Sequence, residues 1–157
     1  MTTTREQPWS DEKPVHGRIL VLSTNPISQA VYAIGTTVGR LVVVLADDDG
    51  GPGLAPLMPK EGDAVVLCDH DAPDAPQFLR DALASPASYV AMMASPRRAE
   101  GLISDLAAEG VPGLDKLHVP AGHNLGGKAP GEIALSVVAE IVAESYERPG
   151  GPMRGPR

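Results

Sequence analysis

Five short apolar runs recur along the chain, each separated from the next by a segment that mixes polar and apolar positions. The runs are RILVLST (18–24), LVVVLA (41–46), AVVLC (64–68), YVAMMA (89–94) and KLHVPA (116–121). The first four are nearly continuous in valine, leucine, isoleucine and methionine, which is typical of strands covered on both faces of a sheet. The pattern therefore predicts a buried sheet of five strands.

The segments between these runs carry the 3.6-residue period of helices. Helices are predicted from Asn25-Pro26 to Gly39, over 76–83, over 96–109 and over 130–145. The stretch 46–63 is broken by proline and glycine, so we expect a loop or one short turn there. The alternation of strand and helix predicts one α/β, Rossmann-like domain over residues 17–146. Its five strands should form a doubly wound parallel sheet in the order 3-2-1-4-5. Residues 1–16 and 147–157 are expected to be flexible tails.

The last predicted helix is apolar around most of its circumference. Its polar residues Glu132, Ser136 and Glu140 are four positions apart and share one narrow edge. Such a helix is expected to be largely buried, and an exposed apolar side would pack against another chain, so we expect a homodimer. A carboxylate as deep in the helix as Glu140 needs a partner.

Composition narrows the classes of function. The 157 residues carry a net charge of −7 and a pI near 5.0, which argues against nucleic acid or an anionic membrane surface as a partner. The single cysteine, Cys68, excludes an internal disulfide and fits a reducing compartment. We find no apolar run of about 20 residues and no signal-peptide core, and expect a soluble, cytoplasmic protein.

Polar residues gather where the predicted strands end, which is where parallel sheets bind ligands. Ser95 opens a helix that has Arg97 and Arg98 in its first turn. Arginine there opposes the helix dipole, so a bound anion or acidic partner is one interpretation. The alternative is a structural role, with both arginines paired to Glu100 or to the aspartates at 47–49. Gly122, Asn124, Gly126, Gly127 and Glu132 form a second candidate group, although Glu132 could instead interact with the start of its own helix.

The acidic strand ends have two interpretations each. His70 and Asp71 have donor types suited to a metal or to a general base, but adjacent residues cannot all face one ion, and we predict no metal site. Asp47 lies where a ribose-binding acid would be, yet it also fits a solvated turn. With Ser23 and Asn25 it makes up a candidate nucleotide site.

The order DHDAPD, SYVAMMASPRR and VPAGHNLGGKAPGEIALSVVAEIVAE is similar to the C-terminal Rossmann-like domain of the xanthine dehydrogenase accessory (XdhC/CoxI) family. The resemblance runs from about Arg18 to about Ser145. It implies a maturation factor that binds molybdenum cofactor (molybdopterin) and delivers it to an apo molybdenum hydroxylase of the xanthine or CO dehydrogenase type. Ser95, Arg97, Arg98, Gly122, Asn124, Gly126, Gly127, Glu132, His70 and Asp71 are the corresponding candidate cofactor contacts.

The first turn departs from this family. Ser23-Thr24-Asn25-Pro26 stands where a glycine-rich turn is usual. Asn25 places a side chain where a pyrophosphate would approach, and Pro26 removes an amide donor, so NAD(P) binding is expected to be weak or absent. Family members usually carry an N-terminal domain with a functional cysteine, which a separate partner could supply here. The sequence thus favours a non-catalytic cofactor-binding chaperone over the alternative, an NAD(P)- or nucleotide-binding oxidoreductase-like domain.

Overall fold

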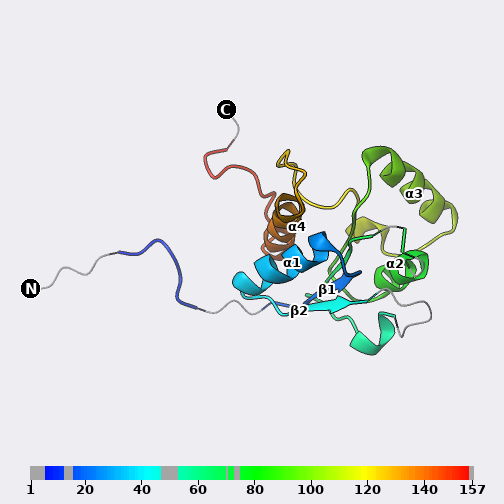
Figure 1. The fold of residues 1–157 in the computed structure, drawn as a ribbon, viewed down its shortest axis with the longest axis horizontal. Coiled ribbons are helices and arrows are strands. Elements are labelled where there is room, and N and C mark those ends of the chain that lie inside the picture. Colours follow the sequence, from blue (N-terminus) through cyan, green and yellow to red (C-terminus); the bar gives the residue numbers. More distant parts are fainter. Residues whose placement is uncertain (1–5, 13–15, 47–52, 70, 73–74, 156–157) are drawn as a thin grey trace, which may run out of the picture.

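The five predicted strands form one parallel sheet in a computed structural model, which describes residues 6–12, 16–46, 53–69, 71–72 and 75–155 (Figure 1). The fold class inferred from the sequence is confirmed. The strands are β1 (Ile19–Leu22), β2 (Val42–Leu45), β3 (Ala64–Leu67), β4 (Tyr89–Met92) and β5 (Leu117–His118). Each is shorter than the apolar run that predicted it, because the runs continue into the turns at the strand ends.

The strand order is β2-β1-β3-β4-β5, so the predicted order 3-2-1-4-5 is wrong. A third strand beyond β2 would need a crossover helix between β2 and β3. The described part of that connection holds only a 3-10 turn, η1 (Ala55–Leu57). β3 therefore pairs with β1, with Ile19 opposite Ala64, and β2 is left at an edge. β2 is partly exposed, whereas β1 and β3 are fully buried, as expected for an edge strand next to interior ones.

Helices of the described ranges cover both faces of the sheet, as Figure 1 shows. They are α1 (Pro26–Thr37), α2 (Ala75–Ala84), α3 (Pro96–Ala108) and α4 (Pro130–Ser145). Alternate strand residues point to opposite faces. Leu20, Val65 and Val90 pack with α2 and α3 in one core, and Ile19, Val66 and Ala91 pack with α1 and α4 in the other. The helix bounds agree with the predicted ones to within about two residues, the usual uncertainty of helix ends.

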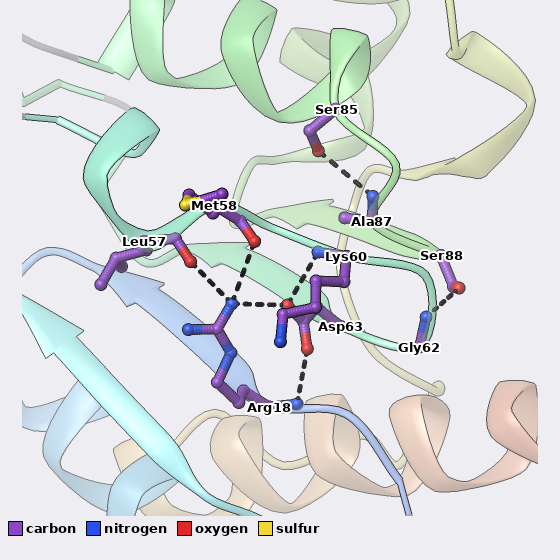
Figure 2. Close-up of polar contacts among 9 residues, drawn as sticks. All are labelled: Arg18, Leu57, Met58, Lys60, Gly62, Asp63, Ser85, Ala87 and Ser88. Carbon is purple, nitrogen blue, oxygen red and sulfur yellow. Dashed lines mark hydrogen bonds and ion pairs between the residues drawn. The ribbon is translucent and has the colours of Figure 1, made fainter.

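The amino-terminal edge of the sheet is held by a network of hydrogen bonds around Asp63 (Figure 2). Its carboxylate accepts from the backbone amide of Arg18 at 2.8 Å, from that of Lys60 at 2.9 Å, and from the Arg18 guanidinium at 2.8 Å. The same guanidinium donates to the Leu57 carbonyl at 2.8 Å. Burial alone would raise the pKa of Asp63, but the bonds from Arg18 and Lys60 outweigh it and lower that pKa.

A close backbone approach completes this edge. A Cβ on Gly17 would overlap the carbonyl group of Gly62, so only glycine fits at position 17. The amide of Gly62 donates to the hydroxyl of Ser88 at 2.7 Å, which ties the start of β3 to the start of β4. None of the helices in the described ranges is long and apolar enough to cross a bilayer.

Candidate functional site

The observed strand order places the topological switch point between the carboxyl ends of β1 and β3, where doubly wound folds commonly bind ligands. Here Asn25 spans that crevice. The side-chain amide nitrogen of Asn25 donates to the carbonyl of Cys68 at 3.1 Å. Its side-chain oxygen accepts from the backbone amide of Ser28 at 2.9 Å. The hydroxyl of Ser28 accepts in return from the backbone amide of Asn25 at 2.8 Å. The side chain predicted to obstruct a pyrophosphate is thus also the N-cap of α1.

The start of α3 lies at the end of β4, beside the end of β3. Ser95 is its N-cap, and the hydroxyl oxygen of Ser95 accepts from the amide of Arg98 at 3.2 Å. The guanidinium of Arg98 pairs with Asp71 at 3.2 Å, and both side chains are more than half exposed. Arg97 is exposed, and its side chain has no hydrogen bond or ion pair with another residue that the structure describes. The predicted pairing of Arg98 with a carboxylate exists, therefore, but the carboxylate is on the β3 loop.

The glycine-rich loop after β5 folds onto α4. A Cβ on Gly122 would overlap the hydroxyl of Ser136, and a Cβ on Gly127 would overlap the carboxyl group of Glu132. Glu132 itself accepts from the amide of Ala129 at 3.3 Å, at the start of its own helix. Gly122 and Gly127 thus allow the loop to approach α4, which leaves exposed Asn124 and Gly126 to face solvent.

A buried polar cluster, centred on Glu140, lies beneath this loop. The Oε1 atom of Glu140 accepts from the hydroxyl of Tyr89 at 2.6 Å and from the amide of Gly122 at 3.2 Å. The Nδ1 atoms of two histidines face its carboxylate, that of His118 at 3.6 Å from Oε1 and that of His123 at 3.9 Å from Oε2. Burial, followed by the effect of Glu140, raises the pKa of Tyr89.

Sequence reasoning expected a partner for Glu140 but did not find Tyr89 or His118. The alternation of side chains between the two faces of each strand could have identified them. Tyr89 and His118 are the polar members of two apolar runs, and both point to the α4 face, where their rings stack with centroids 4.4 Å apart. Pairing the polar positions of strands and helix on one face would have brought the three residues together.

The structure describes only some of the remaining candidate residues. Ser23 is buried at the end of β1, whereas Asp47 and His70 lie outside the described residues. Burial raises the pKa of the Cys68 thiol to about 12, so this side chain is a core residue with little thiolate at neutral pH. The described ranges contain no group of three or more His, Cys, Asp or Glu side chains placed to hold a metal ion.

Two cavities accompany these features. The larger, about 930 Å³, opens at the amino-terminal edge between Arg18, Asp63 and the end of α4. The smaller, about 170 Å³, lies between α2 and α3 and is lined in part by Arg98 and Met92. Parallel sheets bind ligands at their carboxyl edge, and Arg18 and Asp63 are already bonded to each other, so we place the candidate site with Arg98.

Comparisons with known proteins agree with this fold. The family model of the XdhC Rossmann domain matches residues 19–141. Uncharacterized protein YqeB of Escherichia coli K12 is 37% identical over 73 residues, 45% of this chain and 14% of YqeB. A crystal structure of a Bacillus halodurans protein, described as a xanthine dehydrogenase, has a TM-score of 0.68 at 19% identity, over 85% of this chain and 44% of that one. The chain spans less than half of either protein. Because the family model covers most of its length, this chain belongs to the XdhC Rossmann domain family.

Proposed function

We propose that this domain binds molybdenum cofactor and serves the maturation of a molybdenum hydroxylase, as a non-catalytic module. The observation that carries the proposal is membership of the XdhC Rossmann domain family over residues 19–141. The name xanthine dehydrogenase, carried by the Bacillus halodurans protein of the same fold, is consistent with it. An apo molybdenum hydroxylase is the proposed partner, with a separate N-terminal XdhC-type domain as a second one.

The residues at the start of α3 fit the anionic part of this cofactor. Pro96 has no N–H and the Arg98 amide donates to Ser95, so the backbone amide of Arg97 is the first-turn donor left for a phosphate. The exposed side chain of Arg97 can add a charge-assisted bond. Exposed ion pairs contribute little, so the contact between Arg98 and Asp71 can give way to a phosphate. When bound, the cofactor would supply the phosphate and the pterin. Arg97 and Arg98 would hold the former, and Asn124 and Gly126 lie on the loop proposed to border the latter.

The alternative, an NAD(P)-binding domain, is less well supported. A pyrophosphate at the end of β1 would have to displace the bond from Asn25 to the Cys68 carbonyl. It would also have to compete with Asn25 for the amide of Ser28. We therefore propose weak or absent NAD(P) binding, to be checked by calorimetric titration of the full chain with NAD⁺ and NADP⁺.

The test of the main proposal is titration with molybdenum cofactor released from a molybdenum hydroxylase. Wild-type protein should bind it, and a variant with Arg97→Ala and Arg98→Ala should bind at least about tenfold more weakly, the loss expected for charge-assisted bonds. The control is Lys60→Ala, which removes an exposed cation at the amino-terminal edge of the sheet, away from the start of α3. Equal binding by the double variant and the wild type would contradict the site, and no binding by the wild type would contradict the function.

We also propose a homodimer through the α1 and α4 layer. Leu135 of α4 and Tyr32 of α1 are about half exposed, although large apolar residues usually lie inside. Light scattering should give twice the mass of one chain at micromolar concentration. A monomer at that concentration would remove this proposal.

A further inference from the structure

The chain turns back on itself after α4. Glu147 has a positive φ of 55°. The amides of Glu147 and Arg148 donate to the carbonyls of Glu144 at 3.0 Å and Ala143 at 2.9 Å, which closes the helix end as a Schellman motif does. The segment that follows reaches the loop after β5. A Cβ on Gly150 would overlap the imidazole of His123 at Nε2, so the Gly150 backbone lies against that edge of the ring.

The covered nitrogen of His123 has no hydrogen-bond partner in the described part of the chain. Nε2 is buried and forms no hydrogen bond with any residue that the structure describes, although the side chain as a whole is 25% exposed. A buried polar atom left unpaired destabilises the fold. The ring therefore gains no hydrogen bond from the segment that covers it.

The other side of the ring is held in place. Nδ1 faces Oε2 of Glu140 at 3.9 Å, and the amide of His123 donates to the carbonyl of Ser136 at 3.2 Å. A carboxylate that faces Nδ1 favours the proton on that nitrogen and leaves Nε2 as an acceptor. Glu140 is itself fixed by Tyr89. The ring is thus oriented from behind, with its acceptor nitrogen directed at residues 148–151.

The covering segment is weakly attached. Residues 148–151 are Arg-Pro-Gly-Gly, and all four are exposed. Among the residues that the structure describes, their one hydrogen bond is that from the backbone amide of Arg148, and none of the four has a large apolar side chain to anchor the segment. Segments with few buried contacts open at low cost.

We propose that residues 148–151 form a displaceable cover over His123, and that displacing them opens Nε2 as a hydrogen-bond acceptor for an N–H group of the bound cofactor. The second part rests on the proposed function, because a pterin is rich in N–H donors; the first part does not. The cover would make cofactor binding depend on the state of the C-terminal segment. His123 lies next to Asn124 in the loop already proposed to border the pterin.

Diethylpyrocarbonate, which acylates accessible neutral imidazole nitrogens, tests the cover in the full-length protein. Gly150→Ala adds a Cβ that overlaps His123, so it should force the segment away. We expect modification of His123, followed by mass spectrometry, to be about tenfold faster than in the wild type, since protection reflects the equilibrium for opening. Gly150→Asn should behave in the same way, because asparagine tolerates the positive φ of 78° at this position.

Two control variants separate overlap from other effects. Gly151→Ala meets no atom within 4 Å, and Gly155→Ala has a similar positive φ of 75° but also meets none. Both should leave the rate at His123 unchanged, and the rate at His118 should be the same in every protein. An unchanged rate in both Gly150 variants, or a wild-type His123 that reacts as fast as free histidine, would overturn the cover.

Cofactor titration then separates the two parts of the proposal. With an open cover, Gly150→Ala should bind released molybdenum cofactor more tightly than the wild type, and Gly151→Ala should bind it equally. Faster modification with no gain in affinity would confirm the cover and reject the role of Nε2. If the wild type binds no cofactor, the proposed function fails while the modification rates still decide the cover.

Discussion

The two edges of the sheet differ in how their polar side chains are used. At the amino-terminal edge, Asp63 is almost fully buried and accepts three hydrogen bonds (Figure 2). At the carboxyl-terminal edge, Ser95 and Arg97 are exposed, and the pair of Arg98 and Asp71 is open to water. Polar groups saturated by the protein stabilise the fold, whereas exposed polar groups remain available to a ligand. We therefore expect the first edge to contribute stability, and the second is the edge proposed to bind a ligand.

The largest effect is expected from Asp63→Ala. The change leaves the amides of Arg18 and Lys60 and the Arg18 guanidinium without their acceptor in a buried place. Removing the shared acceptor of such a network should lower the free energy of unfolding by about 3 kcal/mol. Urea denaturation, monitored by circular dichroism, measures this free energy. Glu61→Ala, which removes an exposed carboxylate two positions away, should change it by less than about 0.5 kcal/mol.

The same residue gives a dependence on pH. The pKa of Asp63 is lower in the folded protein than in the unfolded chain. Its contribution to stability is therefore complete above the unfolded value of about 4 and is lost as the pH falls through the folded value. The difference between wild type and Asp63→Ala should shrink below pH 4. A constant difference down to pH 2 would mean that ionisation of Asp63 does not stabilise this edge.

A smaller effect is expected from Tyr89→Phe, which tests the connection between the two edges. Tyr89 is the first residue of β4, and its hydroxyl donates to Glu140. Glu140 also accepts from the backbone amide of Gly122, in the loop that follows β5. Losing this buried bond should cost about 1–2 kcal/mol at neutral pH.

Alkaline titration is the control for this variant. The pKa of Tyr89 is raised by burial and then by Glu140, so its contribution is present below the unfolded value of about 10 and is lost as the pH rises above it. Wild-type stability should fall above pH 10 by more than that of Tyr89→Phe. Equal losses would show that Tyr89 does not ionise on unfolding in that range.

The sequence predicted what local patterns determine. Continuous apolar runs identified β1, β3 and β4, and Asn25-Pro26 identified the start of α1, because caps and periodicity act within a few residues. The strand order could not be read in this way, because it depends on which strand β3 joins after a connection without a long helix. The fold class and family are confirmed, whereas the cofactor contacts stay predictions.

The site shows the same division between local and long-range information. Ser95 was expected as a helix cap and is one, since the cap and the amide it accepts from are three residues apart. The partner of Arg98 proved to be Asp71, which is 27 positions away, and the partners of Glu140 come from two strands and a loop. Sequence alone indicated that a buried carboxylate needs partners. Only the register of β4 with β5, Ala91 opposite His118, places them around it.

The smallest effect on stability is expected at the carboxyl-terminal edge, from Arg98→Ala. The change removes the ion pair with Asp71, whose two side chains are 54% and 72% exposed. Because water and salt screen such a pair, the free energy of unfolding should change by less than about 0.5 kcal/mol. In 0.5 M salt the difference between this variant and the wild type should vanish. If Arg98→Ala instead costs as much as Asp63→Ala, the arginine is a structural brace, both edges stabilise the fold, and the anion site at the start of α3 loses its support.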